Sequence, residues 1–483
     1  MRNADSRKRQ LLFPNRQSTI ANPQPPAGNR QSLSFFSATM MVVGNTIGVG
    51  IFTTSGVVAD AVPSVGWLLV VWVLGGILSL AGALTWAELG ATFPHAGGEY
   101  VYLREAFGPF WGFLCGWAIF IAAFSGSIAV LAIALAGSLA HVFSFDASEM
   151  VLGADSVGGI SFLVSYNQLF ALVLVWTISL INYCGLRFGS GTQNVLSFTK
   201  LLAIAVLLLA GFWRGVGDWS HFSPPFLWAP SREFLPAVGV ALIPVLFAYS
   251  GWNAAAYIAS EVHHPEKTLP RALLVGTLIT LGVYLLLNLL YVYAVPLTTL
   301  RGVVQVGELT ASALFGAKAA WVITLLIALS IASAFNVVIL TGGWIYFAMA
   351  KDGVFFRSAA QLHARFQVPG NALLMQAAWT SILILSGTFE QLLTYATIVI
   401  VAFSALTVIA LFVLRWRRPD LPRPYHAWGY PWLPGFYIAA SIGIVLNALW
   451  ERPLECVAGL ILCTVGVPVY YWWRRVDSAA PSA

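Results

Sequence analysis

The 483-residue chain has few charged residues: Asp, Glu, Lys and Arg make up 9% of it, whereas a soluble domain carries about 25%. Hydrophobic residues make up 59%, and apolar runs long enough to cross a bilayer recur along the chain. This composition excludes a water-soluble domain and predicts an all-α integral membrane protein that contacts the lipid bilayer. The net charge of +6 comes from residues between the apolar runs, so we predict no nucleic-acid partner.

Other absences narrow the function. The four cysteines, Cys115, Cys184, Cys456 and Cys463, lie in or beside apolar runs, and no C-x-x-C motif or Cys/His cluster is present. We therefore predict buried free thiols and no metal or other cofactor. The sequence has no phosphate-binding P-loop, which argues against ATP as an energy source. Clustered catalytic residues and a large soluble output domain are also missing, so we expect neither an enzyme nor a membrane sensor.

About twelve apolar runs predict transmembrane helices. They lie near residues 35–58, 65–88, 110–140, 166–185, 193–213, 235–259, 271–296, 318–349, 370–387, 391–414, 432–450 and 453–473. Residues 1–32 are polar, basic and rich in proline near their middle, so we expect a disordered cytoplasmic tail there. Residues 475–483 form a short second tail.

Positive charges set the orientation. An even number of spans places both termini on one side of the membrane. With the amino terminus in the cytoplasm, inner loops and helix ends hold about 20 lysines and arginines and outer ones about 5. We therefore predict a multi-pass protein of the cell (inner or plasma) membrane with cytoplasmic N- and C-termini.

The first span contains a glycine-rich interruption. Its stretch Gly44–Phe52 reads GNTIGVGIF. Because each glycine costs a helix interior about 1 kcal/mol, we expect the helix to open here. The freed N–H groups of Gly48, Val49 and Gly50 would then bind a carboxylate at the start of the second half-helix. The alternative is a small-residue face that packs against another helix.

A second interruption lies in the sixth span. Phe247–Asn253 reads FAYSGWN and follows Pro244, which removes a helical hydrogen bond. A simple proline kink is one interpretation. The other is a second broken helix, whose last carbonyl groups near Phe247–Ser250 would accept hydrogen bonds from a substrate ammonium.

The spacing of the two interruptions favours broken helices. Gly48 and Gly251 are 203 residues apart, with five spans between the start of span one and the start of span six. An odd number of spans per repeat makes the second copy enter from the opposite side, so residues 35–213 and 235–414 form inverted repeats. Matching interruptions in the two halves indicate a transporter's binding site. The transporter core then covers 33–414, and 415–474 adds two further helices.

N–H groups from one break and C=O groups from the other would recognise an α-amino acid. The predicted substrate-binding residues are Thr46, Ile47, Gly48, Val49, Gly50, Phe247, Ala248, Ser250, Gly251, Trp252 and Asn253. Neither break carries a carboxylate that could pair with a cationic side chain, which favours neutral amino acids.

Lys200 is the predicted coupling residue. It begins an apolar run at the inner third of span five, and an ionisable residue there is a functional candidate. Its ammonium could stand where a coupling cation would otherwise sit, or it could carry a proton. A lysine that extends to the interface is the simpler alternative.

One short amphipathic stretch and two glutamates are expected at the inner face. Residues 99–108 follow a Pro/Gly turn and form a short amphipathic stretch, which we expect to lie along the cytoplasmic interface. Glu88 and Glu261 end spans two and six, and we expect both to be interfacial.

These motifs resemble the amino acid–polyamine–organocation superfamily. Gly44–Phe52 looks like its first-helix pattern, and Phe93–Gly108 looks like its first inner loop. Phe247–Asn253 with Glu261–Ala272 is similar to the sixth-helix signature of the L-type amino acid transporter branch, which also carries a lysine at the position of Lys200. The resemblance covers residues 33–474.

The resemblance implies a LeuT-type fold of five-plus-five inverted repeats plus two C-terminal helices, with helices 1 and 6 broken. It also implies sodium-independent amino acid transport, with Phe247 as a gating aromatic. Val49 replaces the usual serine, and Trp344 stands where a polar or basic residue is common. The loop 141–165 has no cysteine, so we expect no disulfide-linked heavy-chain partner.

The sequence therefore predicts a secondary transporter of neutral amino acids that works by alternating access. Either exchange or proton symport would drive it, so protons are a second possible ligand. A transporter of cationic amino acids or polyamines with the same fold is the alternative.

Overall fold

The structure is a computed structural model. It describes residues 33–143, 145, 150–153, 163–214, 216–223, 234–303, 305–386, 389–451 and 453–478. The predicted amino-terminal tail and most of the cysteine-free loop lie outside these residues.

The first half of the chain begins with a helix that is interrupted after Thr46. Its elements are α2 (Phe35–Thr46), α3 (Gly50–Ala61), α4 (Val65–Thr92), α5 (Glu99–Phe107), α6 (Pro109–Ala118), the π-helical η1 (Ile119–Ala123), α7 (Phe124–Val142), α8 (Tyr166–Tyr183) and α9 (Leu186–Arg214). Between α7 and α8, β1 (Met150–Gly153) pairs antiparallel with β2 (Leu163–Ser165).

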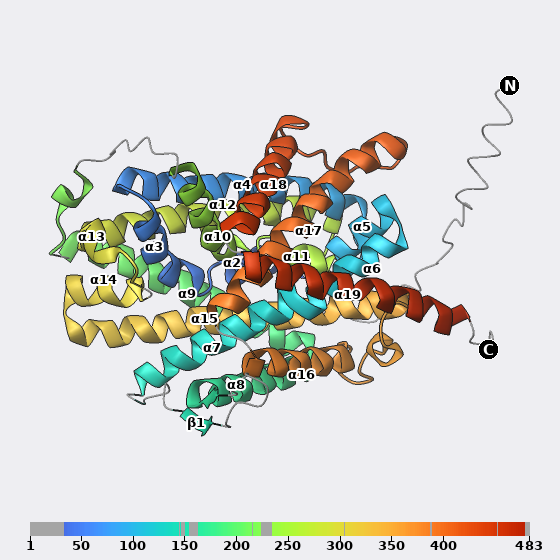
Figure 1. The fold of residues 1–483 in the computed structure, drawn as a ribbon, viewed down its shortest axis with the longest axis horizontal. Helices are drawn as coiled ribbons and strands as arrows, with labels where there is room; N and C mark the ends of the chain where they lie inside the picture. Colours follow the sequence, from blue (N-terminus) through green and yellow to red (C-terminus); the bar gives the residue numbers. More distant parts are fainter. Residues whose placement is uncertain are drawn as a thin grey trace. The chain divides into compact units, whose positions relative to one another are not determined.

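In its described residues, the second half of the chain contains thirteen further elements. They are η2 (Trp219–Phe222), α10 (Phe234–Tyr249), α11 (Ala254–Tyr257), η3 (Ala259–Glu261), α12 (Pro265–Ala294), α13 (Leu297–Leu300), α14 (Val306–Phe315), α15 (Ala317–Lys351), η4 (Arg357–Ala360), α16 (Gly370–Ser386), α17 (Phe389–Arg417), α18 (Trp432–Glu451) and α19 (Pro453–Ser478). In Figure 1, α15 runs beside α7, and α8 lies against α16.

The helices match the predicted spans in position. In the described part of the chain, eight helices are long and apolar enough to cross a membrane, and the bent pair α2 and α3 makes a ninth. Shorter apolar helices cover the three remaining predicted spans, within α10, α16 and α19. The all-α, multi-pass fold is therefore confirmed. At its carboxyl end, α19 continues to Ser478, beyond the predicted end of the last span.

Both predicted helix breaks are present. The axes of α2 and α3 differ by 41° across residues 47–49. In the sixth span, α10 ends at Tyr249, a turn covers residues 250–253, and only the four-residue α11 and the 3-10 helix η3 follow. The proline kink is therefore the wrong interpretation, because Pro244 lies inside α10 and the interruption comes after it.

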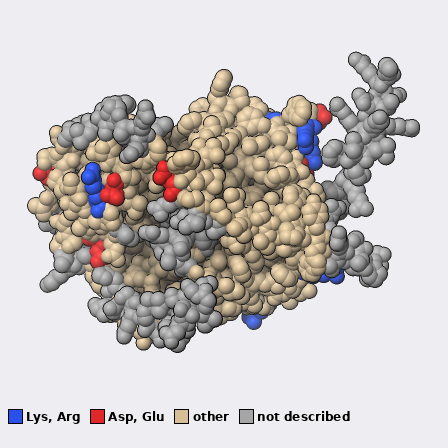
Figure 2. Space-filling model, in the orientation of Figure 1, with Lys and Arg blue, Asp and Glu red and all other residues tan. Residues whose placement is uncertain are grey.

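The surface has the polarity that a bilayer requires. On α9, apolar side chains of one face are more than half exposed: Val195, Phe198, Leu202, Val206 and Leu209. The polar residues of the same helix, Gln193, Ser197 and Lys200, are buried on its other face. Such an inverted amphipathic helix presents its apolar side to lipid. In Figure 2, charged side chains lie mainly toward the two ends of the visible face.

The expectation that residues 99–108 lie along the cytoplasmic interface is wrong. The α5 helix is not an interfacial helix, because Glu99, Tyr100, Tyr102 and Leu103 are all buried in the protein. It is tied to Asp352, the residue that follows α15: the Tyr100 hydroxyl donates to the Asp352 carboxylate over 2.5 Å, and Arg104 pairs with the same oxygen. The helix is therefore part of the packed core.

Of the four free thiols, Cys184 is exposed rather than buried.

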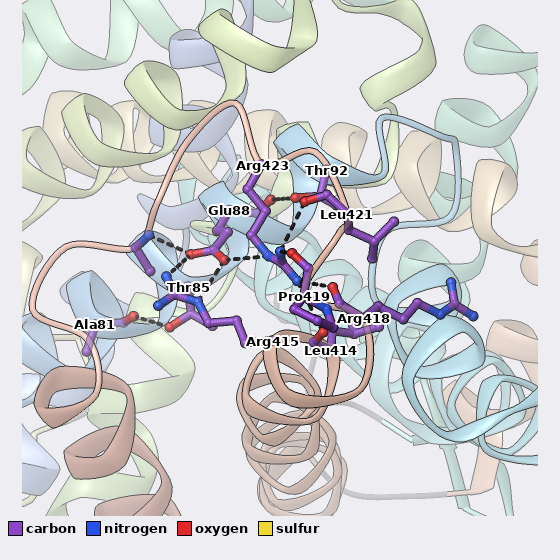
Figure 3. A network of polar contacts seen from close by, with 11 residues as sticks. Ala81, Thr85, Glu88, Thr92, Leu414, Arg415, Arg418, Pro419, Leu421 and Arg423 are labelled. Carbon is purple, nitrogen blue, oxygen red and sulfur yellow. Dashed lines mark hydrogen bonds and ion pairs between the residues drawn. The ribbon is translucent and has the colours of Figure 1, made fainter. Parts of the chain in front are cut away.

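Glu88 is likewise buried, at 1% exposure, rather than interfacial. Arg415 donates to its two oxygens over 2.9 and 2.5 Å, and the backbone N–H of Ala427 donates over 2.6 Å. Arg423 lies on the other side of the carboxylate, 3.6 Å away (Figure 3). A buried carboxylate needs such partners to stay ionised. This cluster fixes the end of α4 to the end of α17 and to the segment that follows it.

Candidate functional site

The first break exposes backbone donors at a helix start. After α2 ends, the amide of Gly48 donates to the Thr46 carbonyl over 2.9 Å, so this donor is already used. The amides of Val49 and Gly50 have no acceptor among the described residues. They stand at the amino end of α3, where the helix dipole is positive. Of the three predicted carboxylate donors, Val49 and Gly50 therefore remain available.

The second break exposes backbone acceptors at a helix end. The Phe247 carbonyl accepts from the Ser250 hydroxyl over 2.7 Å and from its amide over 3.0 Å. The Ala248 carbonyl accepts from Tyr284 over 2.7 Å. Of the predicted acceptors, the Ser250 carbonyl has no donor among the described residues, and an incoming ammonium would depend on it. Gly251, at φ 101°, turns the chain in a conformation that L-residues rarely adopt.

Side chains and close packing hold the two breaks together. The Tyr284 hydroxyl of α12 lies 2.6 Å from the Thr46 carbonyl and 2.7 Å from the Ala248 carbonyl, so its one proton serves both breaks. The Asn45 amide donates to the Gly251 carbonyl over 3.2 Å. Gly50 packs so closely that a Cβ placed there would lie 2.5 Å from Cα of Ala248.

A cavity lies between the breaks. Ten of the eleven predicted substrate-binding residues line it: Thr46, Gly48, Val49, Gly50, Phe247, Ala248, Ser250, Gly251, Trp252 and Asn253. Ile47 does not line the cavity, and its side chain is fully buried in the hydrophobic core. The carbonyl group of Ile47 instead faces Lys200.

Lys200 is directed into the protein and is 2% exposed. Its ammonium donates to the carbonyls of Gly44 over 2.9 Å and Ile47 over 2.6 Å, and lies 3.4 Å from that of Ser330. It thus supplies a positive charge to the carbonyl groups that the first break releases at the end of α2. The interfacial alternative is wrong, and Lys200 is not part of the cavity wall.

The structure adds residues that the sequence did not suggest. Asn45 lines the cavity, and its side-chain oxygen is buried without a donor among the described residues. Ser127 of α7 and Ser404 of α17 bring hydroxyl groups to the same wall. Glu99 reaches the cavity from α5. Ser127, Ser404 and Glu99 come from elements that are far from both breaks in the sequence. Asn45 lies within the first-helix motif, and Glu99 lies within the stretch Phe93–Gly108 that resembles an inner loop.

The match to an amino acid permease family model extends over residues 33–463. The chain therefore belongs to the amino acid permease family. It is 30% identical to the serine/threonine exchanger SteT of Bacillus subtilis over 93% of this chain and 98% of that protein. It is also 29% identical to the large neutral amino acids transporter small subunit 2 of mouse, over 92% of this chain and 82% of the relative.

A third relative is the mouse Asc-type amino acid transporter 1, 28% identical over 92% of this chain and 82% of the relative. Membership of the family and the L-type branch resemblance are thereby confirmed. Its members are transporters, so this permease is a transporter and not an enzyme.

Gly50→Ala tests the contact between the breaks. The new Cβ would overlap Ala248 backbone atoms and push α3 away from α10. We expect the affinity for a bound amino acid to fall at least about tenfold, which corresponds to about 1.4 kcal/mol. Binding of radiolabelled serine, alanine or leucine to the purified protein measures the effect. Gly282→Ala on α12 is the matched control, because nothing lies within 4 Å of a Cβ there. Equal affinities of the two variants would contradict this arrangement.

Proposed function

We propose that this permease is a sodium-independent transporter of neutral amino acids that works by alternating access in the cell membrane. The observation that carries the proposal is the cavity between the two breaks, with free backbone donors at the start of α3 and a helix end at α10. Donors for a carboxylate and acceptors for an ammonium in the wall of one cavity fit the α-carboxylate and α-ammonium that all α-amino acids share.

The cavity wall and the relatives support neutral substrates. Phe247, Trp252 and Phe124 give the wall apolar rings, while Ser127, Ser250 and Ser404 give it small hydroxyl groups. Two relatives are named for exchange of serine and threonine and for large neutral amino acids. A cationic amino acid or polyamine carrier is the second candidate, because the carboxyl group of Glu99 reaches the same cavity.

The surroundings of Lys200 support sodium independence. Its ammonium already takes the carbonyl oxygens that a bound cation would need. With up to three acceptors in place, the ammonium acts as a fixed cation, which favours exchange over a cycle in which Lys200 releases its proton. Proton symport stays the alternative mechanism.

Further parts of the proposal concern assembly and orientation. We propose the inverted repeats 35–213 and 235–414, cytoplasmic termini, and two accessory helices within 415–474. The concentration of lysine and arginine in the assigned inner loops supports this orientation. We also propose that the protein works without a disulfide-linked heavy chain, since loop 141–165 contains no cysteine.

Uptake into proteoliposomes tests the transport mechanism. Vesicles would be empty or loaded with unlabelled amino acids, and uptake of radiolabelled alanine, leucine, serine and arginine would be followed without sodium. We expect uptake of the neutral amino acids only into loaded vesicles and no stimulation by an inward proton gradient. Acid-driven uptake into empty vesicles would establish symport instead, and uptake of arginine alone would favour the second candidate. Strict dependence on sodium would contradict the proposal.

Lys200→Ala tests the fixed cation. The substitution leaves the Gly44 and Ile47 carbonyls without their donor, and each unpaired buried group costs about 1–3 kcal/mol. We expect the exchange rate to fall at least about tenfold at equal reconstituted protein. Lys351→Ala, at the exposed end of α15, is the matched control and should keep the wild-type rate. A wild-type rate in Lys200→Ala would reduce Lys200 to an anchor.

A further inference from the structure

Glu99 is a buried carboxyl group that the transport mechanism described so far does not use. It is the first residue of α5, it is 4% exposed, and it lines the cavity together with Asn253 and Tyr257. Glu99 lies within the inner-loop stretch Phe93–Gly108, but the sequence suggested no role for it, since a glutamate after a Pro/Gly turn is typical of a solvent-exposed helix start.

Both oxygens of Glu99 accept hydrogen bonds from helices that line the cavity. The Thr407 hydroxyl of α17 donates to one oxygen over 3.0 Å, and the Tyr257 hydroxyl of α11 donates to the other over 3.3 Å. The Asn253 amide in turn donates to the Tyr257 hydroxyl over 3.0 Å. A continuous chain of hydrogen bonds therefore joins Glu99 to a residue of the second break.

No cation faces this carboxyl group in the described part of the chain. The titratable groups around it are Tyr102 of α5 itself, Tyr257 of α11, Cys115 of α6 and Tyr437 of α18. Phenol and thiol groups are uncharged at neutral pH. Glu88 provides the contrast, because that equally buried carboxylate is paired with Arg415 and Arg423.

Burial without a counter-charge favours the protonated acid. It raises the pKa of Glu99 to about 8, although the hydrogen bonds from Thr407 and Tyr257 act in the opposite direction. In water a glutamate has a pKa of about 4.3. At neutral pH the buried group is therefore mostly protonated, whereas the same group in contact with water would be ionised.

We propose that Glu99 is a proton-binding site, protonated while α5, α11 and α17 are packed around it and deprotonated when their separation admits water. The proposal rests on the transport function above and adds a ligand to it. Because the packed form has the higher pKa, protonation stabilises it: the full effect is present below about pH 4.3 and is lost as the pH rises through about 8. The Tyr257–Asn253 link connects this equilibrium to occupancy of the cavity.

The proposed role differs from recognition of a cationic substrate. Both oxygens of Glu99 already have donors, and little of the side chain is exposed to the cavity. A substrate ammonium would have to displace Thr407 or Tyr257 to reach it. A proton needs no such displacement, since it only changes which partner donates.

Glu99→Gln tests the proposal, because glutamine has the shape of the protonated acid and cannot titrate. Exchange of a labelled neutral amino acid would be measured in proteoliposomes that have the same pH on both sides of the membrane, at values from 6 to 9. We expect the wild-type rate to change across this range and the variant to keep activity with a flat profile. Glu105→Gln, on the same helix but paired with Arg104 and Arg418, should retain the wild-type profile. A wild-type profile in Glu99→Gln would overturn the proposal.

Thr407→Val gives a second test. If Glu99 had only a structural role, this substitution would not shift the pH at which the exchange rate changes. Loss of this donor removes a hydrogen bond that favours the ionised form, so the pH response should move to higher pH.

Infrared difference spectroscopy of the purified protein detects the protonated carboxyl group directly, without any transport. We expect a protonated carboxyl band at pH 7 that disappears in Glu99→Gln and titrates at alkaline pH. An ionised Glu99 at pH 7 would overturn the inference even if amino acid exchange is established, and a protonated one would support it even if the substrate differs.

Discussion

Two helices of this permease open inside a membrane, and the backbone groups that they release need partners within the protein. Lys200 donates hydrogen bonds to the carbonyls of Gly44 and Ile47. The Tyr284 hydroxyl is a hydrogen-bond partner for one carbonyl group at each break. Among the described residues, the amides of Val49 and Gly50 are left without acceptors, and both residues line the cavity. The same constraint that makes an open helix costly thus determines where a ligand can bind.

Buried carboxyl groups illustrate how surroundings assign roles. Glu88 is held between Arg415 and Arg423 and joins α4 to α17 as a structural group. Glu99 has only hydroxyl donors, so burial favours its neutral form. Both residues are bound by α17, Glu88 by Arg415 and Glu99 by Thr407. Of the two glutamates, only Glu99 borders the cavity. The arginine partners of Glu88 suit a permanent structural contact, whereas the lack of such a partner among the described residues lets Glu99 gain and lose a proton.

Much of the fold could be predicted from the sequence, because membrane spans and helix breaks depend on short, contiguous stretches of residues. Run length located the helices, and glycine with asparagine marked both interruptions. What it could not predict were contacts between distant elements. Tyr284 and Thr407 read as ordinary residues of apolar helices, and the amphipathic pattern of α5 suggested an interface where the fold instead buries Glu99. The charge on Lys200 was visible, but its inward direction depends on the apolar outer face of α9.

Substrate protection would test most directly that the cavity between the breaks holds an amino acid. Ser250→Cys, in a background without the four native cysteines, places one thiol on the cavity wall. A protein that retains only the exposed Cys184 is the control. We expect a transported amino acid to slow alkylation of the cysteine at position 250 severalfold and to leave Cys184 unaffected. Equal alkylation rates with and without a saturating transported amino acid would contradict the assignment of this cavity as the binding site.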